Sequence, residues 1–319
     1  MCSKFLRVFL VLLLFLSVPA VVFSSDLVRV GYYKVMPGLI FFVAKEKGFF
    51  KEEGIKLNEI EFQTSNQLSE AVALEKVDVG MGPALFPILG IESNEPGRIK
   101  IFATLDESSR PELIISKLVV PVDSDINKII DLKGKTIGVF PGIATSTHLK
   151  CALRDFLEPA DYQTVQIPPP LQMQALETGQ VDALFVLEPI PAQSVLKGVG
   201  RVIEDGLLGR YIFEPMVGGV YVFSSAFLEK NPAQAKKVQN AVYKAIDWIR
   251  GNEKEARKIL AAYLPISEEV ALRSSRNKLD KVSLQKDKQK IQRMIDFYYQ
   301  EGVLSKKIDA ANLLVDWQN

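Results

Sequence analysis

Two stretches decide the fold: SEAVALEKVDVGM (residues 69–81) and QMQALETGQVDALF (residues 172–185). A shift of 104 positions aligns them and places Asp78 on Asp182. Each stretch predicts a helix, a tight turn and a buried strand that opens with Val-Asp. Both are preceded by a predicted strand and followed by a predicted helix. The pattern therefore indicates two similar α/β lobes rather than one large sheet.

Short apolar strands and helices alternate through both lobes. The expected elements are strands at 27–33, 56–62, 77–81 and 136–140, a helix within 38–50 that stops near Gly48, and a helix at 64–75. Thr64 fits the first position of a capping box, with Gln67 three residues later. In the second lobe, the three prolines at 168–170 exclude a helix over that run.

The C-terminal part of the chain is predicted to be helical. Asn231 suits a helix cap and Pro232 suits the first helical position. Further helices are expected at 253–263, 267–276 and 283–300. We expect this tail to pack back on the first lobe. The lobe boundaries are then 25–118 with 215–319 for the first lobe, and 119–214 for the second.

The first 24 residues have the order of a secretory signal. Lys4 and Arg7 precede an apolar run at 8–16, and small and apolar residues follow, with cleavage expected near Ser24. The apolar run is short for a membrane span. Cys2 lies too early to be the lipidated cysteine of a lipoprotein. We therefore expect a periplasmic protein that is soluble after cleavage.

Charge and cysteine content limit the partners. The chain has 319 residues and a formal net charge of +1, which gives no overall field for a nucleic acid. Of its two cysteines, only Cys151 remains after the predicted cleavage, so no intramolecular disulfide can form. We expect no nucleic-acid partner.

The stretch VFPGIATSTH (139–148) contains the only histidine, His148. Any catalytic or metal site that needs a histidine would therefore have to include this stretch. Ser146 is two residues from His148, and side chains two apart on a helix do not face each other. His148 and Cys151 can share a helix face, but two ligands are too few for zinc. KGKT (133–136) lacks the earlier glycine of a phosphate-binding loop. We expect no catalytic residue, metal site or cofactor, and a surface or lobe-edge position for His148.

The same stretch predicts a strand followed by a helix that begins with hydroxyl groups, after Gly142. The free N–H groups and the dipole of the first turn favour an anion or polar acceptor there. In open α/β sheets, ligands bind beyond the carboxyl ends of the strands. Simple capping of the helix by Thr145 or Ser146 is the alternative, and both roles can coexist.

Four segments in order resemble one family: GYYKVMPGLIFFVAKEKGFFKEEGIKL, VDVGMGP, DLKGKTIGVFPG and ALETGQVDALFVLEPIPAQ. They resemble the extracytoplasmic solute-binding proteins of ABC importers for nitrate, sulfonates, taurine and thiamine-precursor pyrimidines. The resemblance covers about residues 27–250. It implies a bilobal periplasmic-binding-protein type II fold with a two-strand hinge, a cleft ligand, and a permease with its ATPase as partner. We expect a monomer, with crossings near Leu118–Val120 and Tyr211–Gly218.

The resemblance also implies which residues contact the ligand. From the first lobe and the return segment these are Tyr32, Tyr33, Pro37, Thr64, Ser65, Gly82, Pro83, Gly218 and Tyr221. From the second lobe they are Gly142, Thr145, Ser146, Thr147 and Glu188. At least one of the two adjacent tyrosines is expected to be a core or rim residue. Glu188 can instead cap the helix that begins at Pro189.

The ligand stays open between two classes. Hydroxyl groups at a helix N-terminus suit an anion such as a sulfonate or nitrate. A tyrosine with Glu188 could imitate the stacking and carboxylate of the pyrimidine-binding members. Arg110, near the expected hinge, is a candidate for binding such an anion. The rival hypotheses are an enzyme on the same fold, like the pyrimidine synthases with their cysteine-rich motif, and a sensor without a transporter.

Overall fold

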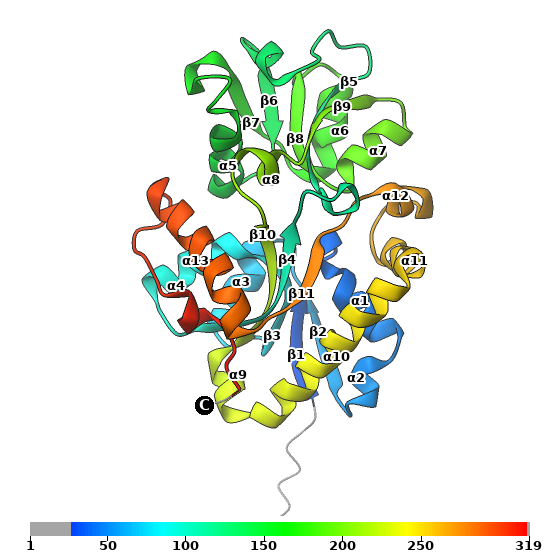
Figure 1. Cartoon of the computed structure of the whole chain (residues 1–319). Helices are drawn as coiled ribbons and strands as arrows, with labels where there is room; N and C mark the ends of the chain where they lie inside the picture. Colours follow the sequence, from blue (N-terminus) through cyan, green and yellow to red (C-terminus); the bar gives the residue numbers. More distant parts are fainter. Residues whose placement is uncertain (1–26, 318–319) are drawn as a thin grey trace, which may run out of the picture.

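The computed structural model describes residues 27–317, without the side chains of residues 284 and 285. The predicted signal at 1–24 lies outside this part. The described strands form two sheets, one above the other, joined by segments that cross between them (Figure 1). The lower sheet has the order β11-β4-β10-β3-β1-β2 and the upper sheet β7-β6-β8-β5-β9. The two-lobed α/β fold is thus confirmed.

The lower sheet consists of β1 (Leu27–Tyr32), β2 (Lys56–Glu61), β3 (Val79–Ala84), β4 (Ile99–Glu107), β10 (Met216–Ser224) and β11 (Lys278–Lys281). The upper sheet consists of β5 (Ser116–Pro121), β6 (Thr136–Val139), β7 (Gln163–Gln166), β8 (Ala183–Leu187) and β9 (Gly200–Asp205). We call the lower and upper units the first and second lobe.

The helices of the first lobe are α1 (Leu39–Glu46), α2 (Phe49–Glu52), α3 (Ser65–Ala73), α4 (Leu85–Asn94), α9 (Ser225–Lys230), α10 (Pro232–Gly251), α11 (Glu253–Tyr263), α12 (Glu268–Arg273) and α13 (Leu284–Gln300). Those of the second lobe are α5 (Ile143–Leu153), α6 (Pro169–Glu177), α7 (Ile190–Leu196) and α8 (Leu207–Tyr211). Short 3-10 turns include η1 (Met36–Gly38), which precedes α1.

The internal repeat corresponds to the same local structure in both lobes. Strands β2-β1-β3-β10-β4 match β7-β6-β8-β5-β9, with the parallel and antiparallel pairs at the same places. The Asp78 carboxylate accepts a hydrogen bond from the N–H of Arg29, and Asp182 does so from Thr136, both at 2.8 Å. Each aspartate therefore ties the start of its strand to the first strand of its lobe.

Two local expectations are wrong. Helix α6 begins inside the proline run, because Pro169 and Pro170 occupy first-turn positions whose N–H groups have no helical partner in any case. The C-terminal tail is not wholly helical, because β11 pairs antiparallel with β4 and extends the lower sheet. The strand residues KLDK alternate too briefly to predict a strand from sequence.

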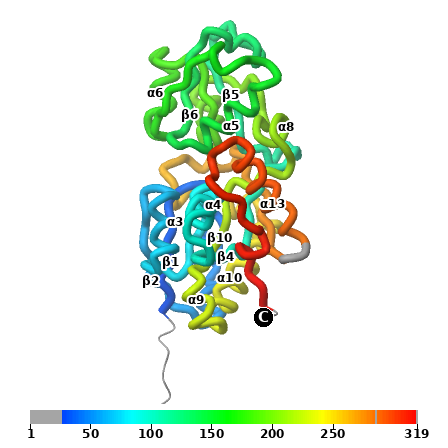
Figure 2. The backbone as a smooth tube through the Cα atoms, turned by 90° about the vertical axis from the view of Figure 1, so that its left-hand side faces the viewer, coloured from blue at the N-terminus to red at the C-terminus, as the bar shows by residue number. Residues whose placement is uncertain are grey.

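The other helices predicted for the tail are present, although α12 ends at Arg273 and not at residue 276. Helix α11 has the predicted bounds, and α13 begins one residue later than predicted. Figure 2 shows α13 and the C-terminal segment running beside α4 and β10 of the first lobe. No helix in the part that the structure covers is long and apolar enough to cross a membrane.

The chain crosses between the sheets twice, and Glu107, the last residue of β4, is bonded to residues that lie next to both crossings. The first crossing lies between β4 and β5, ahead of the expected Leu118–Val120, which are buried in β5. The Glu107 carboxylate accepts hydrogen bonds from the N–H and hydroxyl of Ser116, at 2.8 and 2.7 Å. It also accepts one from the N–H of Gly209, in α8 just before the second crossing, at 3.1 Å. Burial raises the pKa of Glu107, and these donors oppose that shift.

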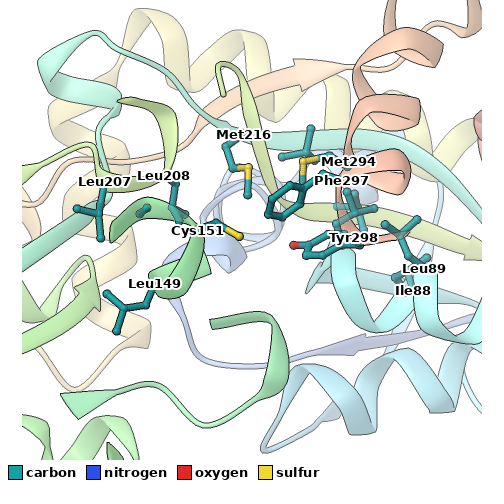
Figure 3. Close-up of a cluster of buried hydrophobic side chains, with 14 of the residues drawn as sticks. Ile88, Leu89, Leu149, Cys151, Leu207, Leu208, Met216, Met294, Phe297 and Tyr298 are labelled. Carbon is teal, nitrogen blue, oxygen red and sulfur yellow. The ribbon is translucent and has the colours of Figure 1, made fainter. Parts of the chain in front are cut away.

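Apolar residues of both lobes share one continuous core cluster. It includes Leu149 from α5, Met216 from β10 and Phe297 from α13, drawn together in Figure 3. A second cluster lies in the first lobe around α1 and α10, and a smaller one lies in the second lobe. The two lobes are therefore packed against each other as well as joined by the chain.

Candidate functional site

The strand ends define the candidate site. Pairing places the carboxyl ends of β1, β2 and β3 at one edge of the lower sheet, with the amino end of β10. The carboxyl ends of β6, β7 and β8 share one edge of the upper sheet with the amino end of β5. In Figure 1 the carboxyl end of β6 points toward the first lobe. These edges are where an open α/β sheet binds its ligand.

In the first lobe, hydrogen bonds tie the loop after β1 and the start of α3 to the end of β3. The Tyr33 hydroxyl donates to the Gly82 carbonyl at 3.1 Å, and burial raises the pKa of Tyr33 to about 12. The Ser65 hydroxyl accepts from the N–H of Ala84 at 2.8 Å. These side chains fix the loops relative to one another before any ligand is present.

Gly82 and Tyr221 both contact the carbonyl group of Pro37 at the same edge of the sheet. Gly82 has φ +86°, and a Cβ there would lie 2.9 Å from the carbonyl oxygen of Pro37. The fully buried Tyr221 donates to that same carbonyl at 2.9 Å and accepts from the N–H of Phe41 at 3.1 Å. Burial raises the pKa of Tyr221 far above its usual range. Its hydroxyl therefore holds the loop around Pro37, and it already donates one hydrogen bond and accepts another within the protein.

Three other predicted residues of the first lobe make contacts within the protein. Tyr32 packs its ring against Phe41 and Phe42, at centroid distances of 5.1 and 6.1 Å. Thr64 caps α3 by accepting from the N–H of Gln67 at 3.2 Å, as the capping box predicts. Pro83 is buried at the end of β3.

The return segment and the first crossing place two further residues at this edge. Gly218 is exposed in β10. Arg110 is also exposed and lies in the first crossing, 3.6 Å from the carboxylate of Glu112.

The first turn of α5 carries no side-chain cap. Gly142, at φ +136°, precedes the helix in open space. The Thr147 hydroxyl donates back to the Ile143 carbonyl at 2.8 Å, and the Ser146 hydroxyl lies 3.4 Å from the Gly142 carbonyl. The side chain of Thr145 is partly exposed. Simple capping by Thr145 or Ser146 is thus not found, and the first N–H groups of α5 have no side-chain acceptor.

Glu188 is buried and has two partners in its own lobe. One carboxylate oxygen lies 2.9 Å from the Lys117 ammonium, and the other accepts from the N–H of Ala192 at 3.2 Å. Glu188 therefore caps α7, as the alternative interpretation expected. Sequence reasoning missed Lys117, because the pairing of β5 with β8 brings it to Glu188 across 71 residues of chain.

Exposed apolar side chains also gather at this edge of the second lobe. Phe140 and Ile143, 46% and 57% exposed, follow β6, and Leu187, 44% exposed, ends the neighbouring β8. Large apolar groups with this exposure at strand ends offer contact area for an organic group. Phe140 and Leu187 lie inside the segments that carry the resemblance and Ile143 directly follows one, but their exposure could not be deduced from the sequence.

His148 lies at the boundary of the lobes, as expected, but not on the open surface. Its Nε2 is 2.7 Å from the hydroxyl of Tyr298 on α13, and burial lowers its pKa to about 4. Burial also raises the pKa of the Cys151 thiol to about 11. Among the residues described, no three His, Cys, Asp or Glu side chains are placed to hold a metal ion.

A groove of about 580 Å³ is lined by residues of both lobes. Its lining includes Arg154, Phe213, Arg293 and Phe297, and none of the residues predicted to contact ligand. The candidate site at the strand ends is therefore separate from this groove.

The comparison with protein families matches residues 24–265 to the model of the NMT1-like family. The chain belongs to that family. This agrees with the resemblance found in the sequence, since NMT1-like relatives include solute-binding proteins. The chain is 26% identical over 298 residues to a putative aliphatic sulfonates-binding protein of Bacillus subtilis (strain 168), covering 90% of this chain and 85% of that protein.

Enzymes also occur among the relatives of this chain. A 4-amino-5-hydroxymethyl-2-methylpyrimidine phosphate synthase of Saccharomyces cerevisiae is 24% identical over 233 residues, covering 70% of this chain and 66% of that one. Among solved structures, the periplasmic aliphatic sulphonate binding protein of Escherichia coli superposes with a TM-score of 0.74 at 23% identity. The match covers 93% of this chain and 99% of that chain. This likeness shows that the chain has the same two-lobed fold as that protein.

Proposed function

We propose that this protein is the extracytoplasmic solute receptor of an ABC importer, and that it holds one small organic solute between the strand ends of its two lobes. The fold and the relatives named as binding proteins support a receptor. The proposal includes removal of residues 1–24, a soluble periplasmic monomer, and delivery of the solute to a permease with its ATPase.

The first turn of α5 carries the proposal, because it combines two kinds of contact. Its N–H groups lack a side-chain acceptor and favour a negatively charged or strongly polar group. The exposed Phe140, Ile143 and Leu187 beside it suit an apolar body. A sulfonate with an organic substituent meets both conditions, whereas nitrate has no group for the apolar side chains.

We propose that Tyr33, Ser65, Gly142, Thr145 and Ser146 contact the solute directly. They lie at the facing strand ends and at the first turn of α5. Tyr221 and Gly82 are proposed as supports for these contacts, since Tyr221 is fully buried and Gly82 packs directly against Pro37.

The enzyme alternative has less support from the residues. His148 and Cys151, the side chains most suited to chemistry in this stretch, are turned into the lobe boundary. Burial keeps the imidazole and the thiol neutral at ordinary pH. Neither is placed to react with a solute at the strand ends.

The test is a thermal-shift screen followed by calorimetry on the mature protein. Butanesulfonate and taurine are compared with nitrate, bicarbonate and a 4-aminopyrimidine. We expect butanesulfonate to bind at micromolar concentration, about −8 kcal/mol. At one hundred times its dissociation constant it should add about 2.7 kcal/mol to the unfolding free energy. Stabilisation by a metal ion or nucleotide alone would contradict the proposal.

A further inference from the structure

A side-chain contact joins α5 of the second lobe to α13 of the first, outside both chain crossings. His148 Nε2 and the Tyr298 hydroxyl form a hydrogen bond of 2.7 Å. The imidazole also lies at 25° to the ring of Phe297, with centroids 6.1 Å apart. Residues 148 and 298 are 150 positions apart in sequence. We call this contact, with its neighbours described below, the α5–α13 seam.

The hydrogen bond of the seam joins two neutral groups. Burial lowers the pKa of His148 to about 4 and raises the pKa of Tyr298 far above its usual range. Tyr298 is 2% exposed. Loss of either partner leaves the other buried without it, which is more unfavourable than losing a bond in water. The bond therefore opposes separation of the two helices.

Ion pairs extend the seam along both helices. Arg154, just after α5, places Nη2 2.7 Å from Glu301, which follows α13 directly. Lys150 lies 3.6 Å from the other oxygen of Glu301. The side chains of these two cations are more than half exposed, so each pair contributes little by itself. Together with the His148–Tyr298 bond, they hold the C-terminal half of α5 next to α13.

Apolar side chains fill the seam from both lobes. Cys151 from α5, Leu208 from α8, and Met294 and Phe297 from α13 belong to one buried cluster (Figure 3). Opening the seam would expose this surface, at about 25 cal/mol for each Å². The seam is therefore expected to stay closed while the lobes move about their two crossings.

We propose that the α5–α13 seam is a third connection between the lobes, and that His148 and Tyr298 are positioning residues for the ligand-binding turn of α5. Gly142 lies six residues before His148, which is roughly 9 Å along a helix. A closed seam makes α5 a lever that pivots near His148 and carries its first turn toward or away from the first lobe. The effect on ligand affinity rests on the proposed function, whereas the effect on lobe geometry does not.

The first test compares Tyr298→Phe with Tyr299→Phe. The first variant keeps the packed ring and removes only the hydroxyl bonded to His148. The second removes the hydroxyl of the next tyrosine on α13, which is 43% exposed. Calorimetry with butanesulfonate, well below the unfolding temperature, should show about twofold to tenfold weaker binding for Tyr298→Phe. Tyr299→Phe should bind as the wild type does.

The second test needs no ligand. Spin labels are attached to Lys51→Cys in the first lobe and Lys133→Cys in the second, both exposed positions. The buried Cys151, with its raised pKa, should stay unlabelled. We expect Tyr298→Phe to broaden or shift the distribution of distances between the labels, and Tyr299→Phe to leave it unchanged.

The two tests separate failure of this proposal from failure of the proposed function. If Tyr298→Phe only lowers the unfolding temperature, with the label distances unchanged, the seam is ordinary packing and the inference is wrong. If the distances change but no sulfonate binds the wild type, the seam stands and the proposed solute does not. His148, as the sole histidine, also gives one pair of ring ¹⁵N signals that should shift in Tyr298→Phe.

Discussion

The two lobes present their candidate ligand residues in opposite ways. In the first lobe, Tyr33, Ser65 and Tyr221 all use their hydroxyl groups on backbone partners of the protein. In the second lobe, the first turn of α5 has no side-chain cap and Ile143 beside it is 57% exposed. One edge is already held in shape, and the other has polar and apolar groups available for contact.

This difference teaches that residues from matching places in a repeat need not share a role. The lobes have the same strand order, and Asp78 and Asp182 accept the same backbone hydrogen bond from the first strand of their lobe. The loops beyond the strands differ, because function depends on loops more than on the frame that holds them. Variants in the first lobe should therefore affect stability first, and variants in the second lobe should affect binding first.

The largest effect is expected from Gly82→Ala. A Cβ at φ +86° would meet the Pro37 carbonyl at 2.9 Å, so backbone strain and a steric clash add. We expect a loss of about 2–4 kcal/mol in unfolding free energy, measured by urea denaturation. Gly142→Ala is the matched control, since it also has a positive φ but no atom within 4 Å. Equal losses for the two variants would contradict the comparison.

His148 tests the boundary between the two regions through pH. Its pKa is about 6.5 unfolded and about 4 folded, because burial disfavours the charged ring. Between these values the unfolded chain binds more protons, so stability should fall as pH drops from 6.5 to 4. The loss is at most about 3 kcal/mol.

The matched control for this pH effect is His148→Gln, measured by denaturation at each pH. Carboxylates with raised pKa, such as Glu107, are common to both proteins and cancel in the difference. The stability difference between wild type and variant should shrink as pH falls. Parallel curves for the two proteins would show that the imidazole is exposed to solvent.

Tyr221→Phe should separate support from contact in the first lobe. The variant keeps the buried ring and strands the Pro37 carbonyl and the Phe41 N–H, which the hydroxyl now joins. We expect about 1–3 kcal/mol lower unfolding free energy, with the butanesulfonate affinity nearly unchanged at low temperature. A large loss of affinity with normal stability would make Tyr221 a direct ligand contact.

The smallest effect on the fold is expected from Ser146→Ala in the second lobe. Its hydroxyl makes only a long 3.4 Å contact with the Gly142 carbonyl, so stability should change little. Binding of butanesulfonate should weaken by about 0.5–1.5 kcal/mol, measured by calorimetry. Thr147→Ala is the comparison, because its hydroxyl is held by Ile143 at 2.8 Å and should matter less to the ligand. The reverse order would place Thr147 closer to the solute.

Much of the fold could be predicted because its signals are local. Apolar periodicity, Thr64 as a cap and Gly48 at φ +73° each act within a few residues. Strand β11 was missed because four residues carry no clear period, and only the exposed edge of β4 gives them a partner. The start of helix α6 was predicted wrongly, because proline disfavours the interior of a helix but not its first turn.

The candidate site was predictable as a set of loops and not as a set of contacts. The resemblance to the solute-binding family implied which loops border the cleft, so Tyr33, Ser65 and Gly142 were expected there. That Tyr221 is fully buried, and that Lys117 pairs with Glu188, depends on register between strands far apart in sequence. The same holds for His148 and Tyr298, whose helices meet only after both lobes have folded.

The sequence by itself determined the two-lobed α/β architecture, the repeat and the family, because strand alternation, helix periodicity and turn residues are encoded within short windows. Only the tertiary structure decided which polar groups make hydrogen bonds within the protein and which remain available to contact a ligand. The sequence does not distinguish a hydroxyl that is bonded within the protein, such as that of Tyr221, from one that can contact a ligand, such as that of Ser146. The role of each hydroxyl is set by the burial and by the donor or acceptor that distant segments bring within about 3 Å.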